Sequence, residues 1–237
     1  MKKNYILIGL FIGLLGCCHF PDFGIRQELP DASNSLKNIW FSSMPSSCVM
    51  KHFVTISFSK PQPKQIDFFG YVLIKNGDFR IIAMNDLGLT MLDIFAEQKA
   101  SNLIIVKAWE KLGNPDIIKQ IAKDIYYIFS SQYEIVKPDL TQYTTADNSQ
   151  IFVIKEDRCA WHAWETQNHR PFKIQYGRNG QEISSVRFDY SDGLIGGFPK
   201  KIAVSYPLSE VHIQIQILSL QPKEISNVQF IPTISPK

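Results

Sequence analysis

The chain has 237 residues, of which 45% are apolar, and it carries 25 Lys and Arg against 22 Asp and Glu. This length and apolar fraction are compatible with one domain that buries a core of its own. The net charge of +3 and the lack of a Lys/Arg cluster give no electrostatic reason to bind nucleic acid.

The first 16 residues have the layout of a secretory signal. Lys2 and Lys3 form a charged start, residues 5–15 form an apolar run, and the small Gly16 precedes Cys17. An uncleaved membrane anchor is the weaker alternative, because a spanning helix needs about 20 apolar residues. Residues 1–16 are therefore predicted to be a signal peptide.

This start also resembles the lipobox of bacterial lipoproteins. The resemblance implies that the signal is cut off before Cys17 and that Cys17 is the lipid attachment site, bearing acyl chains such as palmitate. Because Cys18 and not Asp follows it, the resemblance implies a lipid-anchored protein in the outer membrane that faces the periplasm.

Residues 17–45 are rich in Pro, Asp, Asn and Ser and have little periodicity. They are expected to be the lipidated N-terminus and a tether, followed by a single domain over residues 46–237. In a periplasmic protein disulfides are permitted, so a Cys48–Cys159 bridge and unpaired, packed cysteines are both open alternatives.

From Cys48 onward, short strands dominate the pattern. Asn76-Gly77 and Asn179-Gly180 each separate two apolar or alternating runs, and such a pair is the strongest short signal for a hairpin. Residues 211–217 alternate strictly between apolar and polar side chains, as does an antiparallel strand with one buried face. Roughly ten such segments indicate a barrel or a sandwich.

One segment has helical spacing instead. Asn114 is a suitable N-cap and Pro115 a suitable first residue. An apolar stripe follows, and Lys119, Gln120, Lys123 and Asp124 are assigned to the solvated surface. The stripe consists of Ile117, Ile121, Ile125 and Ile128. A helix with one such stripe must lie on something apolar, so we expect it on the concave side of the sheet, in an α+β fold.

Residues 68–88 then carry a resemblance to the LolA/LolB-type carriers, and to LolB in particular. The features are the aromatic pair Phe68-Phe69, the Asn76-Gly77 turn, an aromatic-Arg-aliphatic strand over 79–84, and an Asn-Asp-Leu-Gly loop at 85–88. The later elements follow the family order to about residue 220. LolB-like lipoproteins that are in part encoded beside aryl-polyene genes look at least as similar.

The resemblance implies a curved antiparallel half-barrel with covering helices and an apolar cavity that accepts acyl chains. By position, Leu87, with Leu89, is the loop that meets the membrane or the cargo; a leucine tucked into the body is the alternative. Asp86 stands where the family has proline, which removes a rigid φ and adds a carboxylate. The expected cavity residues are Phe69, Tyr71, Phe79, Ile81, Phe172, Ile174, Phe188, Ile213 and Ile215, for each of which ordinary core is the alternative.

Catalytic signals are weak. Cys159 and His162 are three apart, so on a strand their side chains lie on opposite faces. No Gly-x-Ser-x-Gly elbow, phosphate-binding loop or metal-ligand spacing is present in the sequence. The prediction is therefore a protein that is not an enzyme and has no cofactor or metal.

The function expected from these features is binding and transfer of an acyl chain, a lipoprotein or a similar hydrophobic ligand. Its partners would be that ligand, the membrane through the lipid anchor, and a periplasmic donor protein. The alternative is a structural or assembly lipoprotein with a packed core that contacts a protein partner without a ligand.

Overall fold

A computed structural model describes residues 20–27, 45–60, 62–76, 78–96, 103–109, 115–129, 140–155, 159–168 and 170–230. The predicted signal peptide, Cys17 and most of the predicted tether lie outside these residues. Within the described part, no helix is both long and apolar enough to cross a membrane.

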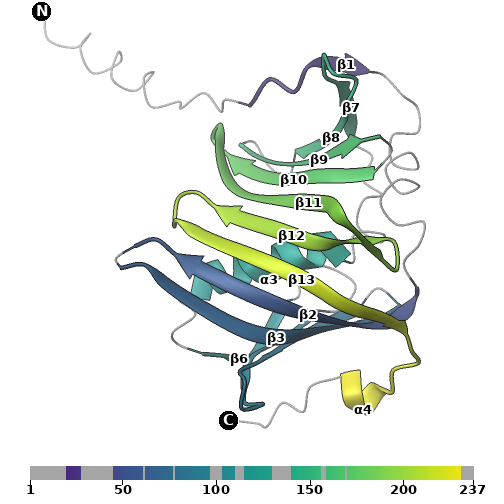
Figure 1. Ribbon diagram of the computed structural model, residues 1–237. Helices are drawn as coiled ribbons and strands as arrows, with labels where there is room; N and C mark the ends of the chain where they lie inside the picture. Colours follow the sequence, from purple (N-terminus) through teal and green to yellow (C-terminus); the bar gives the residue numbers. More distant parts are fainter. Residues whose placement is uncertain are drawn as a thin grey trace, which may run out of the picture.

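The described residues form one long antiparallel sheet of 13 strands, which replaces the roughly ten segments expected from the sequence (Figure 1). The order of strands across the sheet is β1-β7-β8-β9-β10-β11-β12-β13-β2-β3-β4-β5-β6. The strands are β1 (Ile25–Gln27), β2 (Ser47–Phe58), β3 (Lys64–Lys75), β4 (Asp78–Met84), β5 (Thr90–Ala96), β6 (Leu103–Ala108), β7 (Thr141–Thr144), β8 (Gln150–Lys155), β9 (Ala160–Gln167), β10 (Arg170–Arg178), β11 (Gln181–Ile195), β12 (Phe198–Tyr206) and β13 (Val211–Pro222).

Both predicted Asn-Gly hairpins are formed. Lys75 pairs with Asp78 across the first turn, where Asn76 has a φ of 52°. At the second turn Asn179 has a φ of 52° and Gly180 a φ of 78°, and the flanking strands are β10 and β11. Positive φ at both central positions matches the twist of the flanking strands, which is why this dipeptide selects a tight hairpin.

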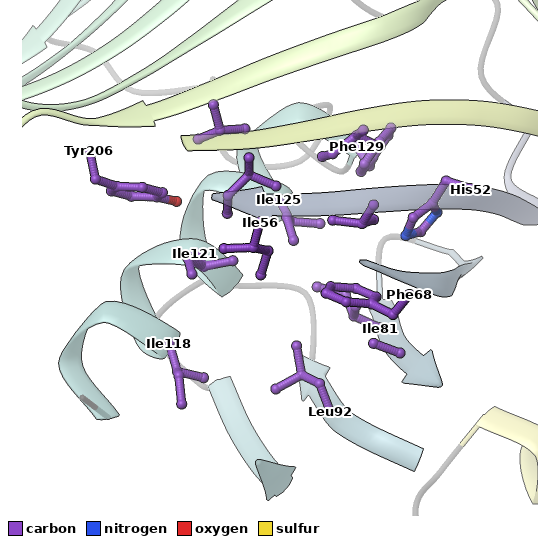
Figure 2. A pocket seen from close by; sticks show the side chains of 15 residues that line it. His52, Ile56, Phe68, Ile81, Leu92, Ile118, Ile121, Ile125, Phe129 and Tyr206 are labelled. Carbon is purple, nitrogen blue, oxygen red and sulfur yellow. The ribbon is translucent and has the colours of Figure 1, made fainter. Parts of the chain in front are cut away.

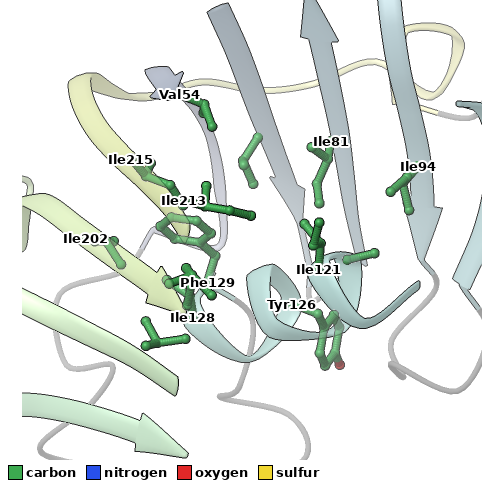
Figure 3. Packing of buried hydrophobic residues seen from close by; sticks show 14 of the residues in the cluster. Val54, Ile81, Ile94, Ile121, Tyr126, Ile128, Phe129, Ile202, Ile213 and Ile215 are labelled. Carbon is green, nitrogen blue, oxygen red and sulfur yellow. The ribbon is translucent and has the colours of Figure 1, made fainter. Parts of the chain in front are cut away.

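The strands near the middle of the sheet alternate as predicted. Along β13 every second side chain is buried, from Val211 to Ile217, and the same alternation runs along β2. The inner face is covered by helix α3 (Pro115–Phe129), which lies across the sheet in Figures 1 and 3. Tyr126 packs on Phe79 with ring centroids 5.1 Å apart, and Phe129 packs on Phe198 at 5.7 Å.

The first part of the predicted tether is docked on the sheet. Strand β1 pairs with β7, and the ring of Phe23 lies 5.2 Å from that of Trp161 and 5.7 Å from that of Tyr143. Lys155 Nζ lies 4.5 Å above the ring of Phe20. This cover explains why β8 and the start of β9 have consecutive buried residues: both of their faces are covered, as in strands with no solvated side.

The end of the chain covers the outer face elsewhere. The short helix α4 (Asn227–Phe230) places Phe230 5.5 Å from Phe95, in a cluster that also holds Ile225. Beside it, Arg80 and Asp93 form an ion pair at 2.7 Å, and Arg80 Nη1 donates to the Phe230 carbonyl at 3.4 Å. The sheet therefore has its main core on the concave face and two smaller clusters on the convex face.

Candidate functional site

An apolar cavity of about 40 Å³ lies between the concave face of the sheet and α3 (Figure 2). Its walls are formed by strands β2, β3, β4 and β5, by the neighbouring strands β12 and β13, and by one face of α3. The lining residues are His52, Val54, Ile56, Phe68, Ile81, Ala83, Leu92, Ile118, Ile121, Ile125, Phe129, Val204, Tyr206, Ile213 and Ile215.

The strand residues of this lining alternate along the chain, as in Ile213 and Ile215, because successive side chains point to opposite faces. The helix contributes Ile118, Ile121 and Ile125, which lie on one face at spacings of three and four. Such a wall offers burial to hydrocarbon and no fixed charge to a polar ligand. At about 40 Å³ the free volume is small, and a lining this apolar offers few hydrogen bonds to water.

His52 is one of the two polar residues in the lining. It is 4% exposed, and its Nδ1 has no hydrogen-bond partner among the described residues. Burial lowers the pKa of His52 from 6.5 to about 4, so the imidazole is neutral near pH 7. Gly70 lies opposite on β3, and a Cβ there would come within 2.2 Å of His52 Nε2. The glycine therefore makes the room that the ring occupies.

Tyr206 is the second polar lining residue, and it lies beside a buried carboxyl group on α3. Asp124 is 4% exposed, and its Oδ1 accepts from Ser184 Oγ at 3.1 Å and from Gln120 Nε2 at 3.1 Å. Asp124 Oδ2 and the Tyr206 hydroxyl influence each other's pKa, but neither has a partner in normal hydrogen-bond geometry within the described residues.

Burial dominates the ionisation of this cluster. It raises the pKa of Asp124 from 3.8 to about 6, against the opposing effects of Tyr206, Ser184, Gln120 and Lys123. Burial also raises the pKa of Tyr206 well above its usual value, and the neighbouring Asp124 adds to the shift. The cluster ties α3 to β11 and so fixes the helix over the cavity.

The assignment of Asp124 to the solvated surface was therefore wrong. Asp124 lies three residues after Ile121 and four before Ile128, which places it within the apolar stripe of α3. That spacing was the available signal. The partner Ser184 comes from a distant strand, and sequence spacing gives no indication of it.

Six of the expected cavity residues are buried on the inner side of the sheet. Ile81, Ile213 and Ile215 line the cavity. Phe79, Ile174 and Phe188 belong to the surrounding packed core and are not in the lining, so for these three the ordinary-core alternative holds.

The other three expected cavity residues are placed elsewhere. Phe69 is 37% exposed, and its ring lies 5.4 Å from that of Phe53 on the outer face; Tyr71 has the same parity on β3. In the aromatic pair it is Phe68 that points inward. Phe172 lies at a register shift of β10, half-buried and 5.9 Å from the guanidinium of Arg187.

The loop between β4 and β5 displays its leucines. Leu87 is 83% exposed and Leu89 is 61% exposed, so the alternative of a leucine tucked into the body does not hold. Asn85 shapes the loop: its Oδ1 accepts from the amides of Leu87 at 3.1 Å and Leu89 at 2.9 Å. Gly88 supplies a positive φ of 76°. The exposed leucine is thus presented by a defined turn.

The Cys48–Cys159 bridge that the sequence left open is not formed. Cys48 is a fully buried free thiol on the inner side of β2, and burial raises its pKa to about 11. Cys159 is disulfide-bonded, with a cysteine other than Cys48. It therefore offers no thiol to His162, which is buried and stacked on Tyr176 with ring centroids 4.6 Å apart.

Among the residues that the structure describes, no group of three or more His, Cys, Asp and Glu is placed to hold a metal ion. The described residues form an apolar cavity whose lining includes two polar side chains and which is covered by α3. Separately, the β4–β5 loop exposes Leu87 and Leu89.

Comparisons with known proteins bear on the fold. The chain matches no family model and no curated protein. Among solved structures, a LolA superfamily protein from Nitrosomonas europaea is similar with a TM-score of 0.53 and 13% identity, over 84% of this chain and 95% of that one. A domain from Vibrio parahaemolyticus described as an outer membrane lipoprotein-sorting protein is similar with a TM-score of 0.54 and 11% identity, over the same shares of both chains.

At these identities the likeness concerns the arrangement of the backbone. It extends over most of both chains. The chain therefore shares its backbone fold with these two solved structures.

Proposed function

We propose that this protein is a carrier of the bacterial envelope that binds an acyl chain, of a lipoprotein or a similar hydrophobic ligand, and transfers it at the membrane. The observation that carries the proposal is the apolar cavity between the concave sheet and α3. The similar fold of the Vibrio parahaemolyticus domain, which is described as a lipoprotein-sorting protein, supports the same role.

Binding would be driven by burial of apolar surface, at about 25 cal/mol per Å². The cavity of about 40 Å³ is smaller than an acyl chain, so entry requires α3 to move outward. The polar cluster at Asp124 and the apolar stripe of α3 oppose that movement, and the ligand's own buried surface would offset it. Release follows when the chain can enter a bilayer.

The anchor and the loop complete the proposal. A lipid on Cys17 would hold the protein at the outer membrane facing the periplasm, and Leu87 and Leu89 would contact the membrane or a periplasmic donor protein. The support for the first is the lipobox-like start of the sequence, and for the second the exposure of both leucines.

The test is a binding measurement on the mature chain from residue 17, with Cys17→Ser so that no acyl chain of its own is attached. The segment 20–27 is retained because it packs on the sheet. Native mass spectrometry with a synthetic diacylated lipoprotein peptide should find a saturable one-to-one complex.

The matched variant is Ile121→Glu, which places a carboxylate in the lining and should abolish the complex. Ile105→Glu on β6 is the control, because Ile105 is only partly buried and outside the lining. A wild-type chain that binds no acylated peptide would contradict the proposal.

The small free volume also favours a second candidate, a structural or assembly lipoprotein whose core is filled by its own side chains. That protein would bind a protein partner without a ligand. For this candidate we expect no saturable complex with an acylated peptide. We also expect replacement of Ile121 to leave binding of the protein partner unchanged.

A further inference from the structure

We infer that His52 donates or accepts a hydrogen bond to an oxygen of the bound chain, so that the ligand is an ester, amide or hydroxyl-bearing lipid and not a plain hydrocarbon. The inference rests on the proposed function and concerns the ligand class that the same cavity accepts.

The first step is the position of the polar groups. Of the 15 lining residues only His52 and Tyr206 carry a side-chain polar atom. In Figure 2 they lie on opposite sides of the cavity, with Ile56 and Ile121 between them. Neither the Tyr206 hydroxyl nor His52 Nδ1 has a hydrogen-bond partner among the described residues. The Tyr206 hydroxyl, however, lies close enough to Asp124 for the two groups to shift each other's pKa, whereas burial alone shifts the pKa of His52.

The second step is that the imidazole is held in place. The ring lies against Gly70, and its Nε2 edge fills the space that a Cβ at that position would take. His52 occurs on the inner face of β2, between Met50 and Val54, both almost fully buried. A packed ring in a fixed place can orient a ligand atom, which a mobile surface histidine cannot.

The third step concerns cost. A buried nitrogen without a partner destabilises the protein, and a leucine of similar size would fill the same space without that cost. Burial keeps the imidazole neutral near pH 7, and a neutral ring offers one donor and one acceptor nitrogen. It therefore suits a carbonyl or a hydroxyl oxygen, and its environment does not favour an ionised carboxylate.

The experiment compares two ligands in two proteins. Methyl dodecanoate and tetradecane have equally long chains when the ester oxygen and the methyl carbon are counted as chain atoms, and only the first contains an ester. Both can be delivered from cyclodextrin. Their dissociation constants are measured by displacement of an apolar fluorescent dye from the mature chain and from His52→Leu.

The substitution should weaken binding of the ester by about five- to tenfold, while binding of the alkane stays within about twofold or tightens. His52→Gln, which keeps a donor and an acceptor, should recover part of the affinity for the ester. Ile213→Ala is the control: it removes apolar surface from the lining and should weaken both ligands alike.

Equal weakening of both ligands by His52→Leu would overturn the inference and assign His52 to packing alone, while the proposed function would stand. Loss of the alkane signal in His52→Leu together with loss of the folded-state urea transition would indicate misfolding, and His52→Gln then decides the matter. Failure of the wild-type chain to bind either ligand would overturn the proposed function and this inference with it.

Discussion

Asp124 is a carboxyl group that lies in the apolar face of a helix, and its ionisation is coupled to folding. Its folded-state pKa of about 6 lies above the ordinary value of 3.8 because the charged form is buried. A group with a raised folded-state pKa contributes stability at pH values below its unfolded pKa, and this contribution is lost as the pH rises through the folded pKa.

For Asp124→Asn we therefore expect a gain relative to wild type that depends on pH. Asparagine can retain the contacts to Ser184 and Gln120, but it has no charge to bury. The difference in free energy of unfolding should be larger at about pH 8 than at about pH 4 by on the order of 2–3 kcal/mol. Urea unfolding at the two pH values measures it, and an equal difference at both would contradict the pKa shift.

Gly70 and His52 make a second residue-scale prediction. Gly70→Ala should destabilise the protein by about 1–3 kcal/mol, because the new Cβ would come within 2.2 Å of His52 Nε2. In the His52→Ala background the same substitution should cost little. A double-mutant cycle by urea unfolding gives the coupling, and additive effects would show that the cost of Gly70→Ala does not come from contact with the His52 ring.

The state of the cysteines is a third residue-scale prediction. Non-reducing peptide mapping should find Cys48 unmodified and Cys159 linked by a disulfide. A Cys48–Cys159 peptide would contradict the structure.

At the scale of single elements, sequence patterns correctly predicted those features that depend on neighbouring residues in the chain. The two Asn-Gly turns, the alternation of β13 and the start of α3 at Pro115 were all predicted, because each depends on neighbouring residues. Which of Phe68 and Phe69 faces inward was predicted wrongly. Two aromatic residues in a row satisfy either parity, and the register is decided by pairing with β2 and β4.

The cavity was predicted only in part for the same reason. Ile213 and Ile215 lie on a strand with clean alternation, so their face was readable. The partnership of Asp124 with Ser184 and of His52 with Gly70 joins residues from different elements. No spacing within one segment indicates such contacts.

The β4–β5 loop is the element whose function can be tested directly. Leu87→Glu should reduce binding of the non-acylated Cys17→Ser chain to vesicles of phosphatidylethanolamine and phosphatidylglycerol by about tenfold or more, because burying a leucine contributes roughly 1.5–3 kcal/mol. Vesicle flotation measures the bound fraction. Stability should not change, since Leu87 is 83% exposed.

Leu208→Glu is the matched control for that measurement. Leu208 is 67% exposed and lies in the turn between β12 and β13. If both variants bind vesicles equally well, or lose binding equally, the β4–β5 loop has no special part in membrane contact.

At the scale of the whole molecule, the fold depends on segments from both ends of the chain. The docking of residues 20–27 on β7, β8 and β9, and of residues 225–230 on the convex face, joins parts that are far apart in sequence. The composition of residues 17–45 is typical of a tether, so sequence alone did not predict that its first part is structured.

Removing that segment gives a prediction for the whole domain. A chain that begins at residue 28 should be less stable than one that begins at residue 17 by several kcal/mol, since two aromatic side chains and a strand lose their contacts. It should also bind an apolar dye at the uncovered Trp161. Urea unfolding of the two chains under reducing conditions, with Cys17→Ser in the longer one, measures the difference without a contribution from the disulfide of Cys159; equal stability would mean that the docking contributes nothing.

The docked Phe20 also sets how far the body can stand from the bilayer. Only two residues separate it from Cys17, a span of at most about 10 Å even when fully extended. If Cys17 bears the lipid, the β7–β9 end of the sheet is held near the bilayer, and the β4–β5 loop belongs to the other end of the strand order. A protein anchored in this way would stay at its membrane, so under the proposed function the hydrophobic ligand would have to be brought to it.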